Sequence, residues 1–225
     1  ILNFDVFKKQ KNSISDRKKT ILKFKKKCIF AVGLQSDRFI KNNNKYKIIP
    51  FRGEYFKIIG ESKKLVKNIV YPTPDLNFPF LGVHFTNNVN DELEVGPNAL
   101  LSFAREKYTS KYDIDINDIK DILTFKGTYP LIFKNLKFAK IEILRSLFKT
   151  YLMKEIHSFF PDIKKKDVIY SRSGIRAQLC KNNGELIDDF KIIEDNHFVH
   201  LVNVPSPAAT SSLSISEHII NNYLW

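Results

Sequence analysis

The chain has 225 residues, with a hydrophobic fraction of 43% and a charged fraction of 27%, which is ordinary for a globular protein with a buried core. No run of about 18 apolar residues occurs, so the sequence predicts no membrane-spanning helix. The first residues have neither a basic segment nor a long apolar run, so no secretory signal is expected.

The formal net charge of +13 is compatible with nucleic acid or an anionic membrane surface as partner. The lysines are scattered, however, and the densest group, residues 23–27, directly precedes an apolar run, as on an exposed hairpin edge. No nucleic-acid-binding motif accompanies the charge. A solvated surface is therefore favoured and no nucleic acid partner is expected, while peripheral contact with a membrane stays open.

The two cysteines, Cys28 and Cys180, lie far apart and have no Cys or His at metal-ligand spacing around them. We expect two small buried side chains, without a disulfide or a metal site.

Residues 1–32 are predicted to form a hairpin that leads into a buried strand. Alternating apolar residues at 2–6 and 21–24 supply its strands, and the polar stretch 11–16 supplies its turn. The apolar run 28–32 ends at Gly33, and Ser36 and Asp37 follow, which is typical of a strand-to-helix junction.

From residue 46 the pattern is typical of strands. We predict strands at 46–59, 65–71, 81–86 and 92–95, which together indicate an antiparallel sheet. Residues 98–107 are predicted to form a short helix.

Further helices are predicted in the middle of the chain. Asp115 can cap a helix over 115–123, and Pro130 fits the first turn of the next one. Apolar residues then recur at helical spacing until Pro161 and predict a core-facing stripe. The stripe consists of Ile141, Leu144, Phe148, Tyr151, Leu152, Ile156 and Phe159.

Strands return at 168–179, 186–193 and 198–202, with a hairpin turn at 181–184 and a polar bend at 194–196. A final helix is predicted over 208–224. The expected fold class is α+β, divided into residues 1–43, 44–167 and 168–225.

Two arginines and a histidine are the residues most able to carry chemistry. Arg52 has the planar fork that matches a carboxylate, and Gly53 beside it permits close backbone approach by a ligand. Arg176 lies in a run that looks buried, where it needs either a ligand or an ion pair with Asp188 or Asp189. His84, on a predicted strand, is a candidate proton acceptor or a structural residue.

Six segments in this order resemble the FAD-dependent L-2-hydroxyglutarate oxidases and dehydrogenases of the D-amino-acid-oxidase-like flavoproteins. They are Pro50-Phe51-Arg52-Gly53-Glu54-Tyr55, residues 80–86, residues 95–99, Gly174-Ile175-Arg176-Ala177-Gln178, residues 188–190 and Pro205-Ser206-Pro207-Ala208-Ala209-Thr210. The resemblance covers the chain from about residue 28 to its end.

This resemblance implies FAD as cofactor, a substrate domain built on an antiparallel sheet (44–167), and pieces of a split Rossmann-like FAD-binding domain (1–43 and 168–225). Residues 28–38 resemble a strand and turn that lie along the FAD. The last helix would direct its first turn at the flavin, where it could stabilise negative charge. The implied cofactor-binding residues are Gly33, Gly53, Gly174, Arg176, Ser206, Pro207, Ala208, Ala209 and Thr210.

The implied reaction is oxidation of a 2-hydroxy dicarboxylic acid to the 2-oxo acid by hydride transfer to flavin. On this reading Arg52, Glu54, Tyr55 and Arg176 contact the substrate, and His84 takes the hydroxyl proton. No residue is assigned to a metal.

The family begins with a glycine-rich dinucleotide motif, and nothing here resembles it. The chain is therefore expected to be part of an enzyme whose N-terminal half is supplied in cis or in trans. Alternatives are a non-catalytic remnant and a basic protein that binds nucleic acid or anionic membranes. The expected location is the cytoplasm, with membrane contact open.

Overall fold

The computed structural model describes residues 8–10, 13–15, 21–40, 43–73, 82–106, 108 and 113–224. Contacts divide the chain into two compact units, which are described one at a time. The small unit combines Ile1–Asn43 with Asp189–Trp225, and the large unit is Asn44–Asp188. Helices and mostly antiparallel sheets make up the described residues, which confirms the α+β class.

The first sheet of the small unit has three strands in the order β1-β2-β3, all antiparallel. They are β1 (Lys8–Gln10), β2 (Ser13–Ser15) and β3 (Ile21–Lys23). The predicted turn at 11–16 is wrong, because its middle forms the central strand. Strand pairing uses backbone groups, so a polar segment can pair as well as an apolar one. The strand predicted at 2–6 lies outside the described residues.

The second sheet has the order β11-β12-β4 and contains one parallel pair. Its strands are β4 (Cys28–Phe30), β11 (Lys191–Asp195) and β12 (Phe198–Asn203). β4 leads into the 3-10 helix η1 (Gly33–Phe39), so the predicted junction at Gly33 is confirmed. The chain closes with α5 (Ser212–Ile219) and a π-helical segment, η4 (Ile220–Leu224).

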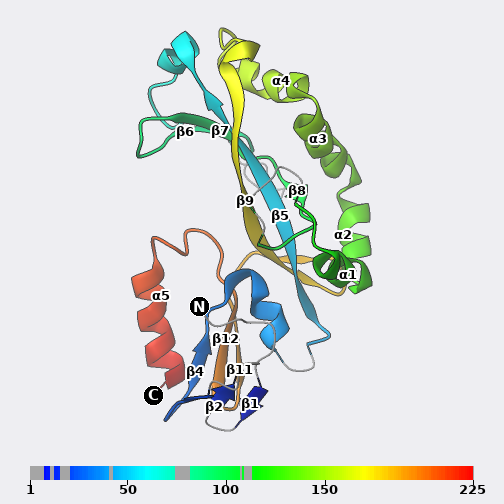
Figure 1. Ribbon diagram of the computed structural model, residues 1–225, viewed down its shortest axis with the longest axis vertical. Coiled ribbons are helices and arrows are strands. Elements are labelled where there is room, and N and C mark those ends of the chain that lie inside the picture. The colour runs from blue at the N-terminus through cyan, green and yellow to red at the C-terminus, as the bar shows by residue number, and fades with distance from the viewer. Residues whose placement is uncertain are drawn as a thin grey trace. The chain divides into compact units, whose positions relative to one another are not determined.

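The large unit is built on two long antiparallel strands, β5 (Tyr46–Ile58) and β9 (Val168–Lys181) (Figure 1). The sheet order is β10-β9-β5-β7-β6, with β8 also paired to β5. The remaining strands are β6 (His84–Asn87), β7 (Leu93–Gly96), β8 (Leu100–Leu101) and β10 (Leu186–Ile187). Short 3-10 helices, η2 (Gly60–Leu65) and η3 (Lys165–Asp167), flank the far ends of β5 and β9.

Four helices follow one another along one side of the long strands (Figure 1). They are α1 (Ile116–Thr124), α2 (Thr128–Lys134), α3 (Leu136–Leu147) and α4 (Lys149–Phe159). Asp115 caps α1 as predicted, since its side chain accepts hydrogen bonds from the backbone of Asn117 and Asp118. The main core packs Phe56, Phe85 and Val95 of the sheet against Leu152, Met153 and Ile156 of α4.

The predicted apolar stripe is correct only in α4, where Leu152 and Ile156 are buried. In α3 the buried residues are polar, Glu142 and Ser146. Ile141 is 45% exposed, and Phe148, where the two helices meet, is 54% exposed. Glu142 accepts a hydrogen bond from the Ala99 N–H, and the Ser146 hydroxyl donates one to Glu54. Because buried polar groups need such partners, the polar side of α3 faces the sheet.

Two other predicted elements are wrong. Residues 98–106, the described part of the helix predicted at 98–107, form the short strand β8 and an irregular segment instead, because Leu100 and Leu101 pair with Arg52 and Phe51 of β5. Most of 65–71 is irregular, with one isolated bridge from Val70 to Phe85. Tertiary pairing overrides local preference at both places.

The boundary predicted at 167/168 is also displaced. β9 pairs with β5 along its whole length, from Tyr46 opposite Lys181 to Ile58 opposite Val168. The chain therefore leaves the large unit after residue 188. The predicted strand 186–193 is accordingly two strands, with β10 in the large unit and β11 in the small one.

Candidate functional site

One face of the large sheet collects charged and aromatic side chains. Tyr55 lies directly opposite Arg172 in the β5–β9 ladder, and residues directly opposite each other project from the same face. Alternation along β9 puts Gly174 and Arg176 on this face too. We call it the polar face; Phe56, Phe85 and Val95 lie on the opposite face, which packs against α4.

Arg172 is held on the polar face by Glu94 and Tyr55. Its Nε and Nη2 donate to the two carboxylate oxygens of Glu94, at 3.1 and 2.8 Å, and its guanidinium lies 4.3 Å from the centre of the Tyr55 ring. Glu94 is only 5% exposed. The hydrogen bonds to Glu94 raise the pKa of Arg172, so the guanidinium stays charged. The arginine side chain itself remains 57% exposed and can meet a ligand.

His84 extends the polar face to β6. It pairs with Gly96 of β7, and Thr86, two residues on, pairs with Glu94. His84 therefore belongs to the same face as Glu94 and Arg172. Neighbouring strands lie about 4.8 Å apart, so His84 on β6 is roughly 10 Å from β5. Gly96 of β7 lies between them. Its Nδ1 lies 3.1 Å from the carbonyl oxygen of Gly82, a contact that fixes the ring.

The paired glycines Gly53 and Gly174 have different surroundings. A Cβ on Gly53 would lie 2.6 Å from Cβ of Pro97 and 3.1 Å from the carbonyl oxygen of Asn98. The space beside Gly53, which the sequence analysis assigned to a ligand, is thus filled by Pro97 and Asn98 of the chain itself. A Cβ on Gly174 would meet nothing within 4 Å, so this part of the polar face has room for a ligand.

Arg52 and Glu54 lie on the other face. Glu54 is fully buried, and its carboxylate accepts hydrogen bonds from Asn98 Nδ2 (2.9 Å), Ser146 Oγ (2.9 Å) and Arg52 Nη2 (3.1 Å). The backbone N–H of Glu54 donates to Asn98 Oδ1 at 2.7 Å. These bonds tie β5 to the loop before β8 and to α3.

The two predicted arginines are therefore not brought together. Phe51 lies opposite Arg176, and Arg52 lies opposite Ile175, one position out of register. Their side chains project from opposite faces of the ladder. The sequence analysis missed Arg172. The alternation of side chains along a strand could have indicated it, because positions 172, 174 and 176 place two arginines on either side of a glycine on one face.

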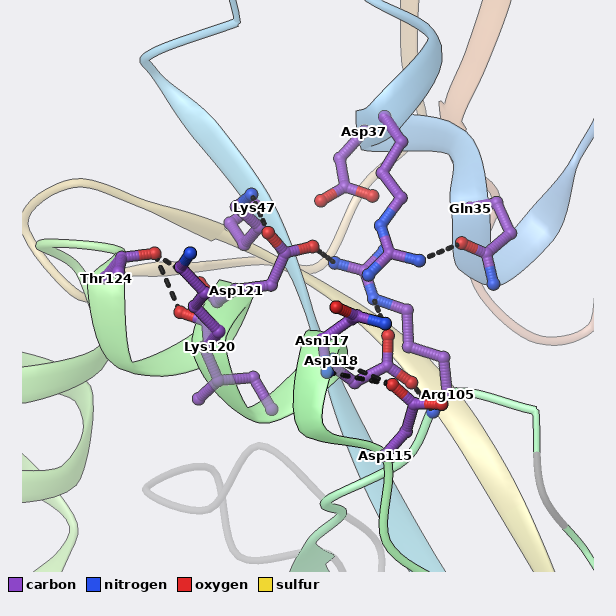
Figure 2. Close-up of polar contacts among 12 residues, drawn as sticks. Gln35, Asp37, Lys47, Arg105, Asp115, Asn117, Asp118, Lys120, Asp121 and Thr124 are labelled. Atoms are coloured by element: carbon purple, nitrogen blue, oxygen red, sulfur yellow. Dashed lines mark hydrogen bonds and ion pairs between the residues drawn. The ribbon is translucent and has the colours of Figure 1, made fainter. Parts of the chain in front are cut away.

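A second network lies where α1 begins (Figure 2). Arg105 is fully buried, its backbone N–H donates to Asp118 Oδ2 at 2.7 Å, and its guanidinium lies 3.6 Å from Asp121. Asp121 also pairs with Lys47 of β5 at 3.5 Å. This cluster fastens α1 to the extended segment after β8 and to the sheet.

In the small unit, two predicted cofactor segments lie at one edge. β4 and β12 are parallel neighbours, with Cys28 opposite Phe198 and Phe30 opposite His200. Gly33 follows the carboxyl end of β4 with φ of +52°, and Ser206–Thr210 follow the carboxyl end of β12. Ligands of parallel sheets bind beyond this edge.

The segment Ser206–Thr210 differs from the prediction in one respect. The sequence predicted helix from residue 208, whereas α5 begins at Ser212. Residues 206–211 form turns, in which the N–H of Ala208 donates to the Pro205 carbonyl and the N–H of Ser211 to that of Pro207. The Thr210 hydroxyl also donates to the Pro207 carbonyl, which competes with a regular first turn.

Across the residues that the structure describes, none of the helices has the length and apolar character needed to cross a membrane. The same residues contain no group of three or more His, Cys, Asp or Glu arranged to hold a metal ion.

Comparison with known proteins agrees with the resemblance in the sequence. An L-2-hydroxyglutarate dehydrogenase of Indibacter alkaliphilus is 46% identical over 191 residues, which are 83% of this chain and 48% of that protein. The mitochondrial L-2-hydroxyglutarate dehydrogenase of Nematostella vectensis is 40% identical over 216 residues, 91% of this chain and 46% of its own length.

The Escherichia coli L-2-hydroxyglutarate dehydrogenase is 37% identical over 196 residues, 86% of this chain and 46% of that protein. The chain thus spans about half the length of the curated relatives it matches. A family model described as FAD dependent oxidoreductase matches residues 6–221. Both the matched range and these relatives cover most of the chain, which therefore belongs to the FAD-dependent oxidoreductase family.

Proposed function

We propose that this chain forms about half of an FAD-dependent enzyme that oxidises L-2-hydroxyglutarate, or a close analogue, to the corresponding 2-oxo acid. The observation that carries the proposal is the polar face, with two arginines, a tyrosine and a histidine around an open glycine. The relatives named L-2-hydroxyglutarate dehydrogenase support the choice of substrate.

Arg172 and Arg176 would bind the two carboxylates of the substrate. Guanidinium groups pair with carboxylates through parallel hydrogen bonds, and the two arginines stand four residues apart on one strand. That spacing is about 13 Å of strand, within reach of both ends of a five-carbon diacid for side chains as long as arginine. Tyr55, already stacked on Arg172, would border the same molecule.

His84 would accept the proton of the substrate hydroxyl. An imidazole suits this role, and the contact of Nδ1 with the Gly82 carbonyl oxygen would orient the ring. In this proposal Arg52 and Glu54 support the site from the opposite face of the sheet. The buried Glu54 carboxylate accepts hydrogen bonds from Asn98 and Ser146 and so holds β5 against the Pro97–Asn98 loop.

FAD, when bound, would supply the acceptor of the hydride from the carbinol carbon. Gly33 and Ser206–Thr210 would hold FAD at the carboxyl edge of β4 and β12. Gly33 adopts φ of +52° and has no side chain, so a ligand could approach its backbone closely. The glycine-rich pyrophosphate motif would come from the remaining half of the enzyme, in cis or in trans, so the isolated chain should bind FAD weakly.

The test is reconstitution with the remaining half of the Indibacter alkaliphilus relative. The complex should retain flavin, and L-2-hydroxyglutarate should bleach it without oxygen. Arg172→Gln should raise KM roughly 10- to 100-fold, the value of a hydrogen bond to a charged group. Lys57→Gln, which alters a cation of the same face that is paired with Glu92, is the matched control and should change little.

A flavin-loaded complex that L-2-hydroxyglutarate does not reduce would overturn the substrate assignment. Submicromolar binding of FAD by the isolated chain would overturn the division of the cofactor site between two halves.

A second candidate property is peripheral contact of a cytoplasmic enzyme with a membrane. Phe133 and Leu136, at the junction of α2 and α3, are 69% and 52% exposed, and exposed lysines flank them at 134 and 137. Apolar residues among cations are typical of interfacial helices. Co-sedimentation with phosphatidylglycerol vesicles tests this, with Phe133→Ser expected to weaken it; salt-sensitive DNA binding without vesicle binding would favour the nucleic acid alternative instead.

A further inference from the structure

The large unit has a groove between its sheet and the helices α2 and α3, with a cavity of about 470 Å³. The wall of this groove is mostly apolar. Packed protein interiors have few voids larger than a water molecule, whose share of liquid volume is about 30 Å³. The cavity is therefore too large to be a packing defect, and we expect another group to occupy it.

The polar groups of the wall do not select a charged occupant. Among the described residues that line the cavity, the charged ones are Arg52 and Asp113, which have opposite signs. The Thr128 hydroxyl donates to a carbonyl oxygen of α1 at 2.6 Å, and Asn135 Nδ2 donates to one of α2 at 2.8 Å. Because these donors already have partners inside the protein, an apolar occupant matches the wall best.

Large apolar side chains of the groove are exposed in this chain. Ile143 and Leu147 of α3 line the cavity and are 49% and 58% exposed. Each directly follows a buried polar residue, Glu142 or Ser146. α3 thus turns polar side chains toward the sheet and leaves apolar ones uncovered, which is the reverse of a surface helix in a globular protein. The other exposed apolar residues of the wall include Phe103, Ile114 and Ile132.

The length of the relatives indicates what covers this surface. The matched part of the chain corresponds to between 46% and 48% of three L-2-hydroxyglutarate dehydrogenases, so more than half of each relative lies outside the match. Interfaces between permanently associated parts resemble a hydrophobic core cut in two, and large exposed apolar patches mark such contacts. An apolar wall beside an unfilled cavity is what such a cut leaves on one of the two parts.

We propose that the α2–α3 groove receives an apolar segment of the remaining half of the enzyme. This inference rests on the proposed function, in which that half is supplied in cis or in trans. It adds a contact to that function, because none of Tyr55, His84, Arg172 and Arg176 lines the cavity. The two halves would therefore meet at the groove as well as at the flavin.

Cysteine labelling with and without the remaining half tests this contact. Ile143→Cys and Leu147→Cys are each made in a Cys28→Ser background, in which the other native thiol, Cys180, is buried. In the isolated chain both positions should react with a maleimide as solvent-exposed thiols do. In the complex with the remaining half of the Indibacter alkaliphilus relative, labelling should slow roughly tenfold or more, because a covered thiol reacts only when the interface opens.

Ile69→Cys in the same background is the matched control, since Ile69 is 58% exposed and does not line the cavity. Its labelling rate should be the same with and without the remaining half. Ile143→Asp, which puts a charge into the groove, should weaken association of the two halves roughly tenfold or more, whereas Ile69→Asp should not. Circular dichroism identifies a variant that fails to fold, and Leu147→Asp then takes the place of Ile143→Asp.

Equal labelling of positions 143 and 147 with and without the remaining half would overturn the proposal. So would protection that the isolated chain already shows: protection that rises with chain concentration would assign the groove to a second copy, and protection by phosphatidylglycerol vesicles alone would assign it to a membrane.

These outcomes are separate from catalysis. A complex that L-2-hydroxyglutarate bleaches, but that leaves both positions unprotected, would overturn the groove contact alone. A complex that protects both positions and is not bleached would overturn the substrate assignment and leave the groove contact in place.

Discussion

Gly53 and Gly174 are direct partners across the β5–β9 ladder, yet only Gly53 is enclosed, by Pro97 and Asn98. One glycine of this pair thus lies against the chain's own 97–98 segment, and the other borders open space. Gly53 lets the loop before β8 cross the sheet, and Gly174 leaves the neighbouring space open.

This pair gives a matched experiment. Gly53→Ala should lower the free energy of unfolding by roughly 1–3 kcal/mol, because the added methyl overlaps Pro97. Gly174→Ala should leave it unchanged or raise it slightly, since the methyl meets no atom and the unfolded chain loses freedom. Urea denaturation measures both. Equal losses would show that Gly174 is also structurally enclosed.

The buried carboxylate of Glu54 is predicted to be a major source of stability for the large unit. One carboxylate oxygen of Glu54 accepts from Ser146 and Arg52 and the other from Asn98, and in Glu54→Gln an amide nitrogen replaces one of these two acceptors. Disrupting a buried ion pair in this way should cost about 3–5 kcal/mol. Glu61→Gln, which breaks the exposed pair with Lys64, should leave the unfolding midpoint nearly unchanged. Similar midpoints for the two variants would contradict this assignment.

Glu142 should make stability depend on pH. Burial raises its pKa, against the opposing effects of the Ala99 N–H and Arg145. The folded chain therefore holds this proton more tightly than the unfolded chain does, and stability falls as pH rises from the ordinary glutamate pKa through the raised one. Glu142→Gln should remove that part of the decline. Unfolding free energies measured from about pH 4 to about pH 8 check this; identical profiles for parent and variant would refute it.

The two cysteines should differ in reactivity. Burial raises the pKa of the Cys180 thiol to about 11, so little thiolate exists near neutral pH. Cys28 is only partly buried. A thiol reagent should label Cys28 first and Cys180 only after denaturation, and Cys28→Ser should abolish the early phase. Rapid labelling of Cys180 in that variant would show that the α2 side of the sheet opens readily.

Several elements could be predicted from sequence because their cause is local. The Asp115 cap, the junction at Gly33 and the turn that holds Gly184 at φ +81° each depend on a few neighbouring residues. The long strand from Tyr46 was predictable for the same reason. Segments whose structure depends on a distant partner were not predictable: residues 100–101 became a strand because β5 lies beside them.

Family membership followed from the order of short motifs in the chain, which the matched relatives bear out. The same motifs contain the residue types that are able to bind a dicarboxylate. Which of those residues share a surface was decided by strand register alone. A shift of one position separates Arg52 from Arg176 and brings Arg172 beside Tyr55, because side chains alternate between the faces of a sheet. No local pattern contains that register; it comes from the pairing of strands more than a hundred residues apart.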